Sequence, residues 1–286
     1  MKTAFAWLLY GIGVTRFAAW WHRKDVVILN YHGIGEDDGG HSAVNLLDLS
    51  VSLENFSSQM AYLKRRHHVI SLREFLAANA EGRQLPDYSV VLTFDDGYRN
   101  FLECAPLLLE QNLQATLFLV TGLMRQENVE PASVHDQTER LSWNEVKALD
   151  QHDVFDFGSH TRSHPSLTSL TPEAIDYELR TSLDDLRSKV KRVMPALAYP
   201  NGSYSGISVG RIASAGYACA LTIDPGPNKI GTSPYRLQRQ TIRGKDDKLM
   251  FAARLSCLTY WLYGCRLLTF SLGSLIASWF NFGASS

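Results

Sequence analysis

The stretch Val90-Val91-Leu92-Thr93-Phe94-Asp95-Asp96-Gly97 decides the fold, because a buried strand and a polar site meet in it. The apolar run at its start predicts a buried strand, and two adjacent carboxylates and a glycine end that strand. Side chains alternate faces along a strand, so Asp95 and Asp96 would diverge if the strand continued. Gly97 supplies a turn here, which lets both carboxylates lean into one site. Two like charges this close need a compensating cation, or one must keep its proton.

A second polar segment, Phe157-Gly158-Ser159-His160-Thr161-Arg162-Ser163-His164-Pro165, follows further along the chain. It offers two imidazoles four positions apart, those of His160 and His164. One carboxylate and two histidines form a ligand set suited to a divalent metal ion, and this set leaves the second carboxylate free as a base. The two segments therefore predict a metal centre at the carboxyl edge of a sheet.

The overall composition excludes several classes of protein. The chain has 286 residues, 45% of them hydrophobic and 20% charged, which is ordinary for a globular protein with a sizeable core and excludes a mainly disordered chain. The net charge is -1 and there is no long basic block, so we expect no nucleic-acid partner. The four cysteines form no C-x-x-C pair and are interpreted as reduced core thiols.

Apolar strands alternate with amphipathic helices along the chain. Besides the stretch quoted above, the expected strands cover residues 26–33, 115–120, 154–159, 196–200, 218–223 and 237–242. The expected helices begin at Ser52, Ser71, Arg99, Ser142, Thr171 and Ser208. This alternation predicts a parallel sheet with both faces covered, and strand–helix units with polar residues at the strand ends indicate a closed or nearly closed β/α barrel of the (β/α)7-like kind.

The hydrophobic pattern divides the chain into residues 1–25, 26–245 and 246–286. The first part is expected to form a hydrophobic helix that packs on the domain or lies on a bilayer, and no cleavage site follows it. In the last part Arg266 and Gly264 interrupt an apolar run, so one spanning helix fits poorly. Short helices docked on the barrel or resting in a membrane interface fit better.

Three segments together resemble the first three motifs of the NodB-homology polysaccharide deacetylases. They are Thr93-Phe94-Asp95-Asp96-Gly97, Ser159-His160-Thr161-Arg162-Ser163-His164 and Ala198-Tyr199-Pro200-Asn201-Gly202. The similarity covers roughly residues 26 to 243 and is nearest to the permuted type that acts on poly-β-1,6-N-acetylglucosamine. It implies a distorted β/α barrel that uses a divalent metal to hydrolyse N- or O-acetyl groups on sugars.

Carried over by position, the resemblance implies that Asp95 is the general base and that Asp96, His160 and His164 are the metal ligands. Three protein ligands leave positions open for water and for the carbonyl oxygen of the substrate. Zinc is the metal expected for this ligand set, with cobalt, nickel or manganese as alternatives. A backbone N–H just after Pro200, that of Asn201, is expected to complete an oxyanion hole as in the family.

The chain departs from the family pattern in two places. The late Leu-x-His motif that supplies the general acid is absent, because no histidine follows His164. His32, in the pair Tyr31-His32, is the natural substitute; the alternative is a histidine hydrogen-bonded in the core. The arginine before the third motif is also missing, and Asn201 replaces the common aromatic residue. Arg239 is expected to bring that positive charge near Asp95; the alternative is that Arg239 is a structural salt-bridge partner.

The leading hypothesis is a metal-dependent N-deacetylase acting on an acetylated polysaccharide or on its lipid-linked precursor, as in exopolysaccharide biosynthesis. One alternative is an esterase that removes O-acetyl groups, and another is a catalytically silent carbohydrate-binding scaffold. From the hydrophobic ends we expect a membrane surface as a partner, contacted through both termini. We expect the protein in the bacterial cytoplasm or peripherally on the inner membrane, with periplasmic export as the alternative.

Overall fold

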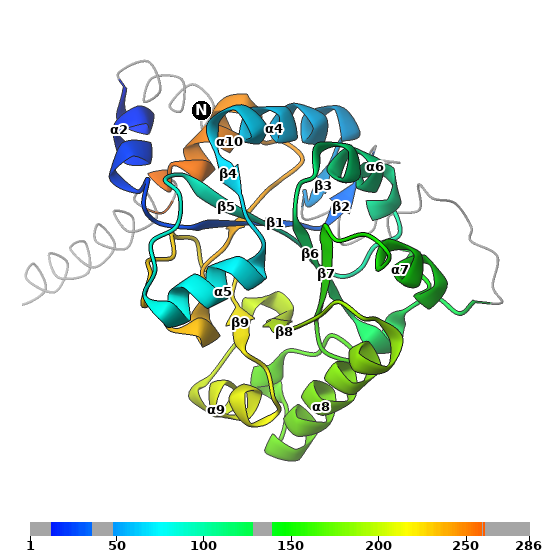
Figure 1. Cartoon of the computed structure of the whole chain (residues 1–286). Helices are drawn as coiled ribbons and strands as arrows, with labels where there is room; N and C mark the ends of the chain where they lie inside the picture. Colours follow the sequence, from blue (N-terminus) through cyan, green and yellow to red (C-terminus); the bar gives the residue numbers. More distant parts are fainter. Residues whose placement is uncertain (1–12, 36–47, 128–138, 259, 261–286) are drawn as a thin grey trace, which may run out of the picture.

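The computed structural model describes residues 13–35, 48–127, 139–258 and 260. In this part of the chain a curled parallel sheet lies at the centre and helices surround it (Figure 1). The sheet has eight strands, which are β10 (Gln240–Thr241), β1 (Val27–Tyr31), β5 (Ser89–Phe94), β6 (Ala115–Leu119), β7 (Phe155–Ser159), β8 (Val193–Ala198) and β9 (Cys219–Leu221) in spatial order, with β4 (His68–Val69) paired to β5. A small separate sheet pairs β2 (Gly33–Ile34) with β3 (Ser50–Val51).

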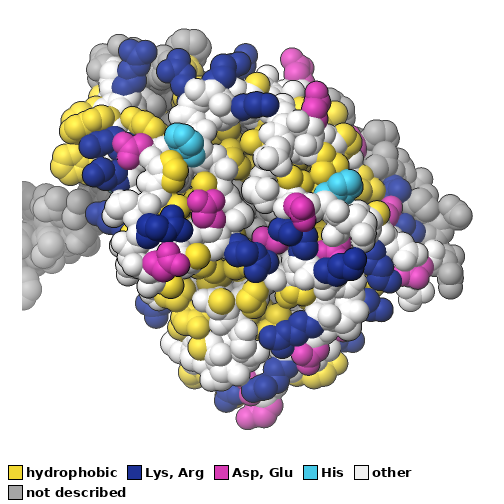
Figure 2. Space-filling view, viewed as in Figure 1, with side chains coloured by type: hydrophobic (Ala, Val, Ile, Leu, Met, Phe, Trp, Pro, Cys, Tyr) yellow, Lys and Arg dark blue, Asp and Glu magenta, His cyan; other side chains and the backbone are white. Residues whose placement is uncertain are grey.

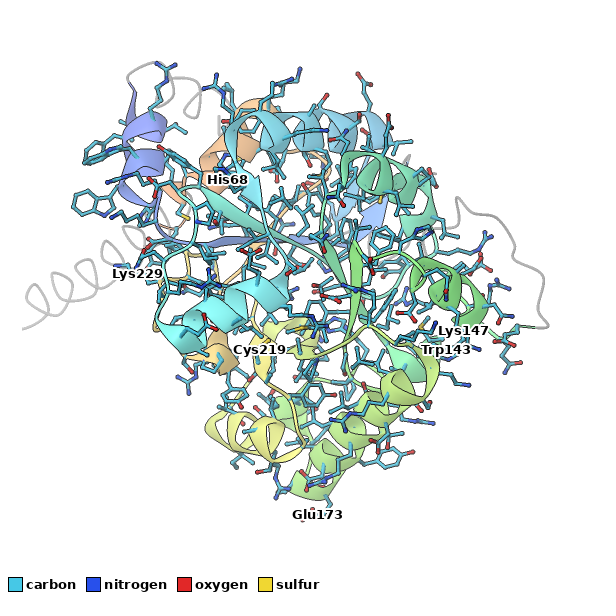
Figure 3. The ribbon with its side chains drawn as sticks, in the orientation of Figure 1. His68, Trp143, Lys147, Glu173, Cys219 and Lys229 are labelled. Atoms are coloured by element: carbon cyan, nitrogen blue, oxygen red, sulfur yellow. The ribbon has the colours of Figure 1, made fainter. Side chains whose placement is uncertain are left out.

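The described helices connect these strands and cover the sheet. They are α2 (Val14–Trp21), α4 (Leu53–Arg66), α5 (Leu72–Glu81), α6 (Phe101–Gln111), α7 (Trp143–Leu149), α8 (Pro172–Lys189), α9 (Gly206–Ser214) and α10 (Lys248–Leu255). Most begin at a serine, threonine or aspartate side chain that accepts a backbone N–H of the first turn, and Ser142 and Glu145 form a full capping box at α7. Figure 3 shows side chains filling the space inside the ribbon, with Trp143 and Lys147 of α7 at its periphery.

Residues 237–242 join the two edges of the sheet. At one end Leu237 donates its N–H to Ala220 and accepts that of Thr222, beside β9. At the other end β10 pairs with β1, and the N–H of Ile242 bonds to the carbonyl of Asn30. The sheet therefore curls into the (β/α)7-like barrel that the sequence predicted.

Strand β5 shows how the barrel divides its side chains between two cores. Val90, Leu92 and Phe94 pack in a core with residues of α4 and α6, whereas Val91 packs in a second core with residues of α5. All six residues of β5 are buried, as expected for a parallel strand covered on both faces. By the same alternation Thr93 and Asp95 fall on the Val91 side of the strand.

Some expected boundaries were wrong. The strand expected over residues 26–33 ends at Tyr31, because the chain leaves the main sheet at His32 and pairs with β3 instead. The strand expected over 237–242 keeps regular pairing at Gln240–Thr241 alone, since its first residues bond to β9 and its last to β1. Helix α9 begins at Gly206, where Ser205 caps it, and not at Ser208.

The structure describes only part of the two hydrophobic end segments that the sequence predicted, residues 1–25 and 246–286. Helices α2 and α10 lie within the first and last predicted parts, and residues 1–12 and 261–286 lie outside the described residues. Among the described helices, none combines the length and apolar character needed to cross a membrane. Cys104, Cys219 and Cys257 are buried free thiols, as expected.

Candidate active site

Asp95 and Asp96 stand at the carboxyl end of β5 and turn toward one site. The N–H of Asp95 bonds to the carbonyl of Tyr31 at 2.9 Å, which continues the pairing of β5 with β1 and sets Asp95 beside His32. Asp96 then has φ 72° and Gly97 φ 65°, so the chain makes two left-handed steps in succession. The sequence interpretation assigned the turn to Gly97 alone; the strained conformation of Asp96 contributes equally.

Arg239 holds Asp95 through both carboxylate oxygens. Its Nη1 and Nη2 donate to Oδ1 and Oδ2 of Asp95, each at 2.7 Å, and its Nε donates to the carbonyl of Thr222 at 2.7 Å. Both side chains of the pair are buried, Arg239 completely. Burial by itself would raise the pKa of Asp95, but the guanidinium outweighs it and holds that pKa well below its usual range. Asp95 is therefore a fixed, ionised carboxylate.

Asp96, His160 and His164 bring three potential ligand atoms to one point. The Nε2 atoms of the two histidines are 3.2 Å apart, and Oδ1 of Asp96 lies 3.7 Å from Nε2 of His160 and 3.5 Å from that of His164. In a tetrahedral zinc site, bonds of about 2.0–2.1 Å place the ligand atoms about 3.3 Å from one another. The three separations fit such a site closely.

The histidine tautomer also fits a metal site. Nδ1 of His160 lies 2.8 Å from the carbonyl oxygen of Ala198, which can only accept, so Nδ1 carries the proton and Nε2 presents its lone pair to the site. A backbone carbonyl in this position is a common partner of metal-bound histidines. The residues present thus suit a divalent cation with nitrogen and oxygen ligands.

The loop between His160 and His164 is held by a buried carboxylate that the sequence analysis missed. Glu178, on α8, accepts the N–H groups of Arg162 and Ser163, both at 2.8 Å, and the hydroxyl of Ser163 at 2.6 Å. His164 itself has φ 63°. Glu178 lies on the apolar stripe of its helix, one residue before Leu179, and a charge at a position of that kind was the available signal.

A cavity of about 470 Å³ opens over these groups. Most of the predicted site residues line it, namely His32, Asp95, Asp96, His160, His164, Tyr199 and Asn201. Pro200 is buried beside them without lining the cavity, and Arg239 lies behind Asp95. Within the described residues, Nδ1 of His32 is buried and has no hydrogen-bond partner. The structure thus brings the residues of all three motifs, and His32, to one place.

The cavity is also lined by Tyr98, Arg140 and Arg243, which the sequence analysis did not select. The guanidinium carbon of Arg140 lies 3.8 Å from the ring centroid of Tyr98, and both side chains line the cavity together with Ser163 and Arg243. Burial, and then the Asp96 carboxylate, raise the pKa of Tyr98 to about 12, so Tyr98 is a neutral phenol at physiological pH. Tyr98, Arg140 and Arg243 come from loops far apart in the chain and carry no local pattern.

Comparisons with known proteins identify relatives of this chain. A sequence model described as polysaccharide deacetylase matches residues 82–220. The poly-β-1,6-N-acetyl-D-glucosamine N-deacetylase of Staphylococcus aureus is 24% identical over 233 residues, which cover 76% of this chain and 78% of that protein.

Two solved structures share the fold. The Streptococcus pyogenes deacetylase PplD, solved in complex with acetate, superposes with a TM-score of 0.69 at 24% identity and covers 81% of this chain and 98% of its own. BC0361, a polysaccharide deacetylase from Bacillus cereus, gives a TM-score of 0.66 at 25% identity and covers 81% and 69%. We conclude that the chain carries a polysaccharide deacetylase domain of the NodB type.

Proposed function

We propose that this protein is a metal-dependent N-deacetylase that acts on N-acetylated amino sugars of an exopolysaccharide or of its lipid-linked precursor. The observation that carries the proposal is the convergence of Asp96, His160 and His164 on one point beside Asp95, whose charge Arg239 maintains. The activity named for the Staphylococcus aureus relative supports the class of sugar.

Asp96, His160 and His164 would hold the cation, with zinc as the first expectation. Such an ion supplies charge that polarises the acetyl carbonyl and lowers the pKa of a water molecule beside it. Asp95 takes the proton of the attacking water, because Arg239 occupies one lone pair on each of its oxygens and leaves others free. The two hydrogen bonds from the Arg239 guanidinium also fix the orientation of the Asp95 carboxylate.

His32 completes the proton transfer in this proposal. An amine is a poor leaving group unless it is protonated, so the cleaved C–N bond needs an acid on the nitrogen side. His32 lines the cavity at the end of β1, the strand next to β5, and therefore lies beside Asp95. On the other wall, we assign the backbone N–H of Asn201 to the oxyanion, because Tyr199 and Asn201 line the cavity there.

The test is acetate release from N-acetylglucosamine oligomers, with and without a chelator. We expect chelator-sensitive release by the wild type, loss of release in Asp95→Asn, and normal release in Asp184→Asn, a matched change at a side chain that is 73% exposed. Release that ignores the chelator would contradict the metal dependence. Release from O-acetylated oligomers alone would assign the protein to the esterases instead.

The ligand assignment has its own test. His164→Ala should lose both bound metal and activity, because it removes one of three ligands. Stoichiometric metal retained tightly by that variant, measured by elemental analysis after dialysis, would contradict the assignment.

A further inference from the structure

Helix α2 exposes a cluster of large aromatic side chains. Phe17, Trp20 and Trp21 are 58%, 50% and 59% exposed, and the ring of Phe17 lies 5.9 Å and 6.1 Å from those of Trp20 and Trp21. The helix buries Thr15 and Ala18 on its opposite side, and its neighbour there is α10. A helix that packs through one side and still presents three aromatic rings on the other has a second surface to cover.

Basic residues surround these rings. Arg16 and Lys24 are exposed beside them, and the guanidinium of Arg23 lies 4.7 Å from the ring centroid of Trp20. Figure 2 shows hydrophobic side chains with dark blue basic ones around them in this corner of the molecule, where Figure 1 draws α2. The nearby carboxylates of Asp25 and Asp87 are paired with His22 and Arg23. We call Arg16, Phe17, Trp20, Trp21, Arg23 and Lys24 the α2 face.

A cavity of about 330 Å³ adjoins this face, between α2, α4 and α10. Arg16 and Arg66 line it with the hydroxyl-bearing residues Thr15, Tyr62, Tyr88 and Ser256, and none of its lining residues is acidic. No ion pair of Arg16 or Arg66 exists among the residues that the structure describes. Two cations among hydroxyl groups, with no carboxylate, suit a phosphate.

We propose that the α2 face docks the protein on a bilayer that contains anionic phospholipids, and that Arg16 and Arg66 bind a lipid phosphate in the adjoining cavity. Tryptophan and phenylalanine suit the boundary between head groups and acyl chains, and the basic residues around them complement the negative charge of such a surface. A helix with this division of residues lies in the interface and does not span it. An uncharged protein surface would leave Arg16, Lys24 and Arg66 without counter-charges.

The α2 face and its cavity lie apart from the catalytic site. Tyr88, in the lipid cavity, directly precedes β5, and Asp95 directly follows it. A six-residue strand at about 3.3 Å per residue separates the two sites by about 20 Å. Changes at the α2 face should therefore leave acetate release from soluble oligomers unaltered, so failure of docking and failure of the deacetylase function can be told apart.

The experiment is co-sedimentation of the full chain with vesicles of phosphatidylcholine, alone or with phosphatidylglycerol. We expect at least tenfold stronger binding to the anionic vesicles at physiological salt. The variant Phe17→Ser/Trp20→Ser/Trp21→Ser should lose about tenfold or more of this binding. The variant Arg16→Gln/Arg66→Gln should lose about fivefold per cation and most of the anionic preference. Ile207→Ser, an equally exposed apolar position on α9, is the control and should bind normally.

Equal binding to both vesicle types, or normal binding by the triple variant, would overturn the proposal. So would a wild-type dimer that the triple variant converts to a monomer without any effect on vesicle binding, because the face would then join two copies. Inorganic phosphate that competes fully with vesicles at low millimolar concentration would assign the cavity to a free phosphate and not to a lipid. Each variant is first checked for a wild-type thermal midpoint.

Discussion

The ion pair between Arg239 and Asp95 allows a sharp prediction about stability. Both side chains are buried, with 0% and 2% exposure, and two hydrogen bonds of 2.7 Å join them. Replacement of one partner leaves a buried charge uncompensated, which costs about 3–5 kcal/mol. Arg239→Gln should therefore lower the free energy of unfolding by that amount at pH 7, measured by urea titration with tryptophan fluorescence.

The loss of stability in Arg239→Gln should depend on pH, because it comes from the charge of Asp95. In the wild type the pKa of Asp95 is depressed, so its stabilisation is complete above the unfolded value near 4 and is lost only as the pH falls below it. Without Arg239, burial should raise the folded pKa of Asp95, and the folded variant then gains a proton as the pH falls. The difference between wild type and Arg239→Gln should shrink from pH 7 toward pH 4.5.

A double variant supplies the control. Arg239→Gln/Asp95→Asn removes both charges and should recover part of the lost stability, with a coupling free energy of about 1–3 kcal/mol, while acetate release stays absent. Arg239→Lys keeps the positive charge but loses the bidentate hydrogen bonding to Asp95, so it should retain only part of the activity. An Arg239→Gln variant within about 0.5 kcal/mol of wild type, or a loss independent of pH, would refute the reasoning, since either requires an Asp95 that does not depend on Arg239.

Three further predictions concern single histidines and the loop carboxylate. Glu178→Gln should weaken zinc binding by about 10–100-fold in calorimetric titration, because it disturbs the three hydrogen bonds that shape the ligand loop; Ser163→Ala, which removes one of them, should have a smaller effect, and the reverse order would argue against this role. Burial lowers the pKa of His67 to about 4, so the unfolded chain binds the extra proton between pH 6.5 and 4; thermal melts should show the wild type losing about 2 kcal/mol more than His67→Gln over that range, and equal losses would contradict it. His32→Ala should keep its metal and slow amide hydrolysis by roughly a hundredfold, whereas an unchanged rate would pass the role of the acid to another group.

Local sequence patterns predicted most of the strands and helices and the residues at the centre of the site. Mainly apolar runs of strand length predicted β5 and β6, because a strand buried on both faces carries mostly apolar side chains. The pair Asp95–Asp96 and the spacing of His160 and His164 could also be recognised from the local sequence. Each group sits directly after a strand, and parallel strands end at one edge of the sheet.

Contacts between distant parts of the chain could not be predicted from such local patterns. Arg239 meets Asp95 across 144 positions because residues 237–242 close the barrel between β9 and β1, and the hypothesis about that contact came from a missing family arginine and from no local signal. Glu178 reaches the ligand loop from the middle of α8, and its role depends on how that helix packs.

By itself the sequence determined the alternation of strands and helices, the carboxylate pair and the two imidazoles, since these depend on residue type and near-neighbour spacing. Only the tertiary structure decided that Asp96 bends back through a left-handed conformation, that Asp95 is clamped by a buried guanidinium, and that the aromatic side of α2 stays exposed. Those features arise where strand pairing and helix packing bring separate segments together, and the free energy of such contacts is set by burial and geometry that no local pattern contains.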